Sequence, residues 1–222
     1  MKVILFGASG MVGQGVLLEC LKDSGVTQVL VIGRSSIGKS HEKIKEALHK
    51  DFSDFTSLKE TMTGFDACFF CLGVSSVGMS EQDYTHITYG FTLAAAKILA
   101  QVNPGSVFIY VSGEGTDSTE RGNSMWARVN GKTENDVAKL FPGKACAFRP
   151  GAILPYDGIL PKNRSLKILL RVLWPLLAIL RWFPSLATDT RTLGRAMIRV
   201  VRDGAPPIAN TSAINRLGGD LK

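Results

Sequence analysis

Short apolar segments alternate with longer amphipathic ones along the first 150 residues. The apolar segments have the length and composition of buried strands and cover residues 2–6, 27–32, 66–72, 106–111 and 145–148. The spacing of apolar positions between them predicts helices over about 11–22, 80–102 and 124–140. Residues 41–52 are ambiguous, because Ile44, Ala47 and Leu48 have helical spacing where the order of elements requires a third strand.

This alternation predicts an α/β fold, a doubly wound parallel sheet with helices on both faces. A length of 222 residues fits a single domain. We expect a nucleotide-binding core over residues 1–155 and a short helical region over 156–222 that serves as a lid over a substrate site. Ligands of such sheets bind at the carboxyl ends of the strands, so the functional residues are sought there.

Glycines recur at a spacing of three directly after the first predicted strand, in the run Gly7-Ala8-Ser9-Gly10-Met11-Val12-Gly13. Gly7 permits a tight turn off the strand, Gly10 lets the backbone approach a pyrophosphate, and Gly13 lets the next helix pack closely on the sheet. The N-terminus of that helix offers free N–H groups to phosphates. The loop therefore predicts a dinucleotide site, with Ser9, Met11 and Val12 as further contacts.

The end of the second strand indicates which dinucleotide binds. NAD-specific sites place an acidic residue there, which accepts hydrogen bonds from the adenosine ribose. This strand instead ends in Val31-Ile32-Gly33-Arg34-Ser35-Ser36, which contains no acid. The Arg34 guanidinium can pair with a 2′-phosphate, helped by the Ser35 hydroxyl, and Lys39 adds positive charge nearby. We expect NADP(H) to be preferred, with NAD(H) as the alternative; a plain loop arginine is the other interpretation of Arg34.

Together with three later segments, these features resemble the atypical, extended-type short-chain dehydrogenase/reductases, which include the NAD-dependent epimerases and dehydratases and share a Rossmann-type fold. The three segments are Cys71-Leu72-Gly73, Tyr110-Val111-Ser112 and Phe148-Arg149-Pro150-Gly151. Within this superfamily the chain is similar to the branch of the Tat-interacting tumour-suppressor oxidoreductases. The resemblance implies that Asp51 and Phe52 lie near the adenine and that Leu72 and Gly73 line the cofactor ribose. It also implies that the nicotinamide is bordered by Pro150, Gly151, Ala152 and Ile153.

The catalytic centre departs from the pattern of the family. Redox-active members carry Tyr-x-x-x-Lys on the helix after the fifth strand, where the tyrosine is the general acid–base and the lysine holds the nicotinamide ribose. The matching positions here are Trp126 and Asn130. Tryptophan does not exchange a proton near neutral pH, and asparagine can bind a ribose without bringing charge. Ser112 matches the family's active-site serine or threonine, and Tyr156 is the nearest other candidate for a proton donor, unless it is a packing residue.

Residues 165–183 are rich in leucine but contain Arg171, Pro175 and Arg181, so no uninterrupted stretch is long enough to span a membrane. Three interpretations stay open: a cap over the substrate pocket, which we favour; the interface of a homodimer; or a segment lying on a membrane surface with its arginines toward the headgroups. Beyond it, residues 190–201 predict a short helix.

Charge and cysteine placement narrow the class of protein. The net charge of +7 is concentrated between Lys162 and Arg202, where basic residues alternate with leucines rather than with stacking aromatics, so we expect no nucleic-acid partner. Cys68 and Cys71 lie on opposite faces of a predicted strand, so we expect buried thiols. The apolar run 2–6 is too short for a signal peptide, so we expect a cytoplasmic protein. No histidine or cysteine spacing suggests a metal site.

Three functions stay open at this point, because fold alone does not choose among them. The first is an NADP(H)-dependent oxidoreductase or epimerase/dehydratase-like enzyme with a rearranged centre. The second, which Trp126 and Asn130 favour, is a non-catalytic dinucleotide-binding regulator or sensor. The third is a membrane-surface or assembly protein that uses the basic C-terminal region.

Overall fold

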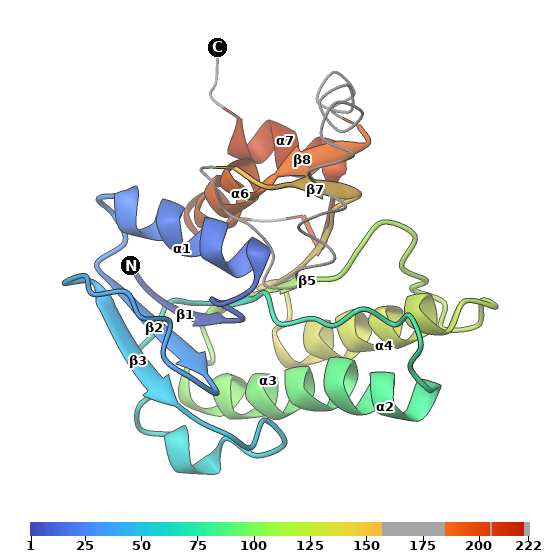
Figure 1. Cartoon of the computed structure of the whole chain (residues 1–222), viewed down its shortest axis with the longest axis horizontal. Helices are drawn as coiled ribbons and strands as arrows, with labels where there is room; N and C mark the ends of the chain where they lie inside the picture. The colour runs from blue at the N-terminus through green and yellow to red at the C-terminus, as the bar shows by residue number, and fades with distance from the viewer. Residues whose placement is uncertain (157–184, 205, 220–222) are drawn as a thin grey trace.

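Seven parallel strands form one sheet in the computed structural model, which describes residues 1–156, 185–204 and 206–219 (Figure 1). The order across the sheet is β3-β2-β1-β4-β5-β6-β9. The strands are β1 (Lys2–Phe6), β2 (Gln28–Gly33), β3 (Ile44–Leu48), β4 (Ala67–Phe70), β5 (Val107–Val111), β6 (Ala145–Arg149) and β9 (Ile208–Asn210). The chain builds outward from β1 to β3, then returns to the other side of β1 with β4. This confirms the predicted Rossmann-type sheet.

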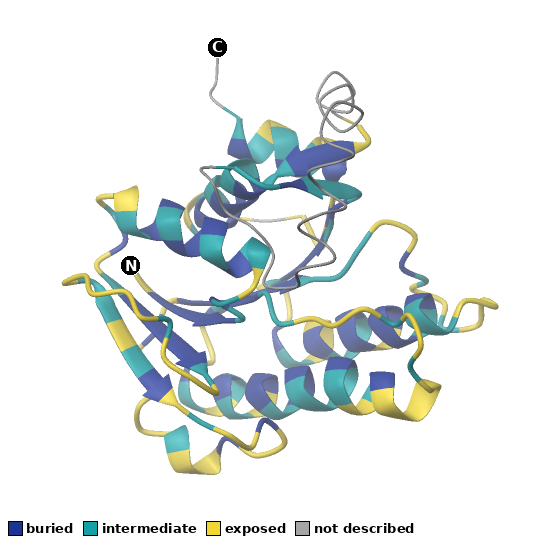
Figure 2. Ribbon diagram, viewed as in Figure 1, coloured by how far each residue is buried: buried dark blue, intermediate teal, exposed yellow. Residues whose placement is uncertain are grey.

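Helices cover both faces of the sheet, as its near-continuous apolar strands require. Helices α1 (Met11–Lys22) and α6 (Thr190–Asp203) lie on one face, and α3 (Phe91–Val102) and α4 (Met125–Leu140) lie on the other (Figure 1). Side chains alternate along β1, so that Val3 and Leu5 pack in the first core and Ile4 and Phe6 in the second. The strands between these helices are accordingly buried (Figure 2).

The structure decides the ambiguous residues 41–52 and divides the long helix predicted over 80–102. Residues 44–48 form β3, so the order of elements outweighs the helical spacing there. The long helix predicted from residue 80 is instead α2 (Glu81–Thr85), a π-helical turn (His86–Gly90) and then α3. Ser80 caps the start of α2, because its hydroxyl accepts a hydrogen bond from the N–H of Asp83 at 3.1 Å.

The C-terminal part of the chain contributes to the same sheet. The predicted helix over 190–201 is confirmed as α6, and α7 (Thr211–Gly218) packs against it. Strand β9 extends the sheet, while β7 (Ala152–Leu154) and β8 (Ala187–Asp189) form a separate parallel pair. The sequence does not predict these strands, because three residues are too few to show a period.

The sequence singles out residues 165–183 as a cap over the pocket, a homodimer interface or a membrane-surface segment. The segment 165–183 lies outside the described residues, so its three interpretations stay predictions. Among the helices that the structure describes, none is long and apolar enough to cross a membrane.

The cysteines face two different cores. Cys68 packs among the residues under α3 and α4, and Cys71 packs against the core under α1 and α6. All four cysteines are free thiols, and burial raises the pKa of both Cys68 and Cys71. The pair therefore packs as ordinary apolar residues on opposite faces, as predicted.

Candidate functional site

The glycine loop forms a tight turn between β1 and α1. Gly7 has a φ of +79°, and a Cβ atom there would lie 2.6 Å from the carbonyl carbon of Cys71, so a side chain is excluded. A Cβ atom on Gly13 would overlap the carbonyl oxygen of Gly7. Glycine at these two positions therefore lets α1 begin directly against the ends of β1 and β4.

The N-terminus of α1 is left open by this turn. Gly10 is the N-terminal cap residue and is exposed, and it has no side chain to accept from the first N–H groups of the helix. The first intrahelical bond here runs from the N–H of Gln14 to the oxygen of Gly10 at 2.9 Å. The N–H groups of the first turn therefore point out of the helix with the positive end of its dipole, which is the arrangement that binds phosphates.

A cavity of about 250 Å³ lies beside this helix end, between the ends of β1 and β2. Six of the predicted cofactor residues line it: Gly7, Ser9, Arg34, Ser35, Phe52 and Leu72. Five further lining residues are not among those predicted: Ala8, Val31, Ile32, Gly33 and Ile37. Their position next to the two strand ends is the signal in the sequence that indicates them.

Arg34 lines this cavity together with residues of the glycine loop. It is exposed, and among the described residues it forms no hydrogen bond or ion pair. The loop that carries it is anchored, because the N–H of Ile37 donates to Glu46 Oε1 at 3.1 Å. The guanidinium is thus a free cation held beside a cavity of nucleoside size.

Phe52 and Asp51, both predicted near the adenine, lie in different environments. Phe52 is buried and contacts Phe6, Phe55 and Phe91, with ring centroids 5.3–6.3 Å apart, which fixes it as a wall of the cavity. Asp51 is exposed, and its carboxylate accepts the N–H of Ser53 at 2.9 Å in a local turn. Of the two residues predicted near the adenine, the structure brings only Phe52 to the cavity lining.

A second group of predicted residues meets at the ends of β5 and β6. There the Ser112 hydroxyl forms hydrogen bonds within the protein, toward α4 and β6. Its Oγ lies 2.5 Å from Glu134 Oε1 on α4 and 3.2 Å from the carbonyl oxygen of Phe148. Glu134 is buried and pairs with the Arg149 guanidinium, whose Nε is 3.1 Å from both carboxylate oxygens. Glu134 is not among the predicted site residues; its position four residues after Asn130 on one helix face is the signal that indicates it.

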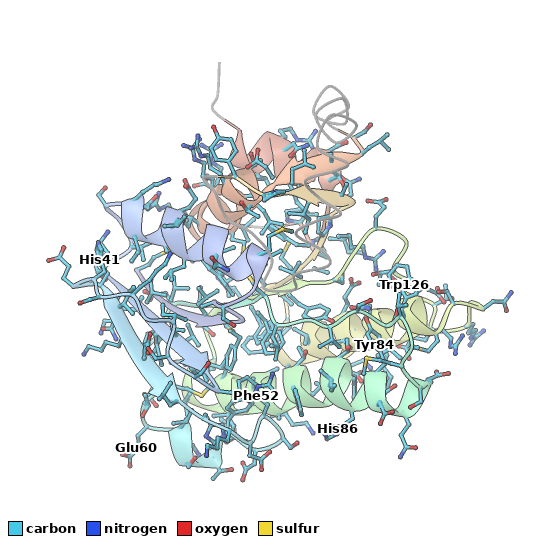
Figure 3. All side chains as sticks on the ribbon, in the orientation of Figure 1. His41, Phe52, Glu60, Tyr84, His86 and Trp126 are labelled. Carbon is cyan, nitrogen blue, oxygen red and sulfur yellow. The ribbon has the colours of Figure 1, made fainter. Side chains whose placement is uncertain are left out.

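Asn130 is buried in a network of its own. Its Oδ1 accepts from the Tyr110 hydroxyl at 2.7 Å, and its Nδ2 donates to the Tyr84 hydroxyl and to the Trp126 carbonyl oxygen, both at 2.9 Å. Figure 3 shows Tyr84 and Trp126 near the same end of α4. The amide of Asn130 is therefore occupied by protein groups, and these bonds leave little of it for a ribose.

Trp126 lies over the loop that follows β5. A Cβ atom on Gly115 would be 3.4 Å from the indole Cη2, and one on Gly113 would be 3.9 Å from Cζ3. Gly113 rather than Ser112 therefore faces the ring, because neighbouring side chains of an extended chain point in opposite directions. The indole covers backbone where side chains at 113 and 115 would otherwise stand.

The segment after β6 borders the same place. The Pro150 oxygen accepts from the N–H of Glu114 at 2.9 Å, and the N–H of Gly151 donates to Thr211 Oγ1 at 2.8 Å. Ala152 and Ile153 continue into β7. Tyr156 donates its N–H to Thr190 Oγ1 at 3.1 Å, and the Arg191 guanidinium lies 3.7 Å from the centre of its ring.

Gly73, predicted to line the cofactor ribose, follows Leu72 but is not among the residues that line the described cavity. In the described part of the chain, no group of three or more His, Cys, Asp or Glu could hold a metal ion.

Comparison with known proteins identifies the family. Residues 3–122 match the model of the NAD dependent epimerase/dehydratase family. The chain belongs to this family. The resemblance seen in the sequence is thereby confirmed.

Two curated relatives share about a quarter of their aligned residues with this chain. Protein HTATIP2 of Rattus norvegicus is 27% identical over 155 residues, which is 68% of this chain and 62% of the relative. Protein FMP52-2, mitochondrial, of Scheffersomyces stipitis is 26% identical over 153 residues, which is 68% of this chain and 65% of the relative. The match thus spans a little under two thirds of the length of each relative.

Solved structures agree in fold. UDP-N-acetylglucosamine 4-epimerase from Methanobrevibacter ruminantium M1 superposes with a TM-score of 0.70 at 14% identity, covering 94% of this chain and 75% of that one. The Bordetella bronchiseptica enzyme WbmF, solved in complex with NAD+, superposes with a TM-score of 0.69 at 15% identity, covering 100% and 79%. At these identities the likeness concerns the fold alone.

Proposed function

We propose that this chain binds a nicotinamide dinucleotide along the carboxyl edge of its sheet and prefers NADP(H). The observation that carries the proposal is the free Arg34 guanidinium on the wall of the cavity that the glycine loop completes. A 2′-phosphate offers two or three oxygens to such a planar fork, whereas a 2′-hydroxyl offers no charge to it.

The residues present fit such a group. Side chains are excluded at Gly7 and Gly13, and the exposed Gly10 leaves the start of α1 open to a pyrophosphate. Phe52, Leu72, Arg34 and Ser35 line the cavity. The first two would give apolar walls for the adenosine, and the last two would lie at its ribose. Pro150, Gly151, Ala152 and Ile153 would border the nicotinamide, which supplies hydride transfer when such a cofactor is bound.

We further infer that the protein binds this cofactor without the usual tyrosine–lysine proton relay. Three observations support this second, non-catalytic candidate: Trp126 stands at the tyrosine position, the Asn130 amide is occupied by Tyr84 and Tyr110, and the Ser112 hydroxyl is turned toward Glu134. The oxidoreductase candidate would need another proton donor, for which Tyr156 is the proposed residue; its ring already contacts Arg191. A regulatory or sensing role follows more directly from these contacts than turnover does.

A pair of titrations tests the proposal. Purified protein, first freed of any cofactor carried through purification, is titrated with NADPH and with NADH by calorimetry. We expect NADPH to bind at micromolar concentration and NADH much more weakly. Equal affinity for NADPH and NADH would contradict the proposed role of Arg34, and binding of neither cofactor would contradict the proposed function.

A further inference from the structure

Glu114 places a carboxylate at the same carboxyl edge of the sheet as Arg34, three strands away. It follows Gly113 in the loop after β5, and its N–H donates to the Pro150 carbonyl oxygen at 2.9 Å. This bond ties the loop after β5 to the segment after β6. The side chain itself is exposed.

The carboxylate of Glu114 reaches toward Gly151. Its Oε2 lies 3.5 Å from the hydroxyl oxygen of Thr211, which is buried and accepts the Gly151 N–H at 2.8 Å. Because the Thr211 oxygen already accepts that N–H, its proton is free to be donated to Glu114. The carboxylate is therefore held beside the segment that would border the nicotinamide.

The negative charge of Glu114 is not neutralised within the described part of the chain, where it forms no ion pair. The arginines at the end of β6 and on α4 are paired with other carboxylates. Arg149 turns its guanidinium to Glu134, and Arg128 holds both carboxylate oxygens of Glu81 at 2.8 and 3.0 Å. Any cation that enters this end of the site would thus meet an unpaired carboxylate.

The spacing of the sheet places this carboxylate within reach of a bound dinucleotide. From β2, which carries Arg34, to β5, which leads to Glu114, there are three strand intervals, or roughly 14 Å. An extended dinucleotide with its adenosine in the cavity is long enough to cover that span. Its adenosine end then meets the cation of Arg34, and its nicotinamide end meets the anion of Glu114.

We propose that Glu114 makes the site discriminate between the oxidation states of the cofactor, favouring NADP+ over NADPH. The nicotinamide ring carries a positive charge when oxidised and none when reduced, while the phosphates are the same in both forms. A carboxylate near the ring therefore attracts only the oxidised form. This inference rests on the proposed function and adds to it a response to the redox state of the cofactor pool.

The test compares dissociation constants for NADP+ and NADPH in the wild type and in Glu114→Gln. The amide keeps the size of the side chain and its contact with Thr211 but removes the charge. We expect the preference for NADP+ to fall roughly threefold to tenfold in the variant, the size of a partly screened charge pair in water, chiefly through weaker NADP+ binding. Glu60→Gln is the matched control, because it removes an exposed carboxylate on the loop before β4.

A second measurement does not depend on the variant. In the wild type, the ratio of the two dissociation constants should move toward one as salt is raised to about 1 M, since screening shortens the reach of the carboxylate. If both cofactors bind with the same ratio in the wild type and Glu114→Gln, or if salt leaves the ratio unchanged, the inference is overturned while cofactor binding stands. If neither cofactor binds the wild type, the proposed function itself fails.

Discussion

The hydroxyl of Ser112 is hydrogen-bonded to the carboxylate of Glu134, with 2.5 Å between Oγ and Oε1. Glu134 is in turn neutralised by Arg149, and the side chains of this pair are only 5% and 16% exposed. Ser112 thus belongs to a buried ionic network under the candidate site. A serine bound in this way is positioned to hold the end of β5 in place.

Removing the Glu134 carboxylate should destabilise the protein strongly. Glu134→Ala leaves Arg149 as an uncompensated charge in a mostly buried place, which costs about 3–5 kcal/mol of unfolding free energy. Asp136→Asn is the control on the same helix. Asp136 pairs with the exposed Lys132 and Lys139 and accepts a hydrogen bond from the Tyr89 hydroxyl, which the amide oxygen of asparagine can still accept, so the change should cost less than about 1 kcal/mol. Urea unfolding measures both, and equal effects of the two changes would contradict a structural role for Glu134.

Asn130 should likewise matter for stability rather than for a ligand. Asn130→Leu leaves the Tyr110 hydroxyl without its described acceptor and the Trp126 carbonyl without its side-chain donor, at a cost of about 2–3 kcal/mol. Asn135→Leu removes the two side-chain hydrogen bonds to Ser118 and Glu120, but from a half-exposed side chain, and should cost about 1 kcal/mol or less. The measurement is again urea unfolding. A stable Asn130→Leu protein with weakened cofactor binding would instead assign this amide to the ligand.

The glycines of the loop should separate into structural and binding positions. Gly13→Ala drives a methyl group into the backbone of Gly7 and should cost about 1–3 kcal/mol. At Gly10 the nearest atom to a new Cβ would be the Gly7 oxygen at 3.3 Å, so Gly10→Ala should cost less than about 1 kcal/mol. It should nevertheless weaken NADPH binding, because the methyl group stands where a phosphate would approach. Thermal unfolding and calorimetry on the two variants distinguish these outcomes.

Asp117 should make the protein sensitive to acid. The Thr119 hydroxyl and the Gly122 N–H, with further backbone donors, lower the pKa of Asp117 to about 2. A pKa below the unfolded value of about 4 means that this stabilisation is present above about pH 4 and is lost as the pH falls toward 2. Asp117→Asn should therefore lose less stability than the wild type between neutral pH and about pH 3.

The control for that comparison is Asp203→Asn, since Asp203 is exposed and accepts no hydrogen bond from the described residues. Its acid sensitivity, followed by urea unfolding at each pH, should match the wild type. An Asp117→Asn variant as acid-sensitive as the wild type would show that these hydrogen bonds do not link folding to protonation.

The features that the sequence predicts correctly are local ones. The turn at Gly7, the open helix start at Gly10 and the arginine at the end of β2 are each encoded within a few neighbouring residues, so pattern alone finds them. The alternation of strands and helices likewise determines the parallel sheet, even where residues 44–48 have helical spacing.

The features that the sequence does not predict depend on contacts between distant residues. Glu134 and Arg149 are 15 residues apart, and Tyr84 and Asn130 are 46 apart, so no local period records either pair. From the sequence, Asn130 is therefore recognised only as a substitute for the family's lysine. Likewise, the direction of the Ser112 side chain depends on α4, which packs against the sheet only in the folded protein.

A thermodynamic cycle that combines Arg34→Ala with removal of the 2′-phosphate tests the central claim most directly. Dissociation constants for NADPH and NADH are measured on the wild type, on Arg34→Ala and on the exposed control Lys45→Ala. We expect Arg34→Ala to weaken NADPH by roughly tenfold or more, the size of one charge-assisted pair, and to leave NADH unchanged, with no change in the control. Loss of both cofactors to the same extent, or of neither, would contradict the assignment of Arg34 to the 2′-phosphate.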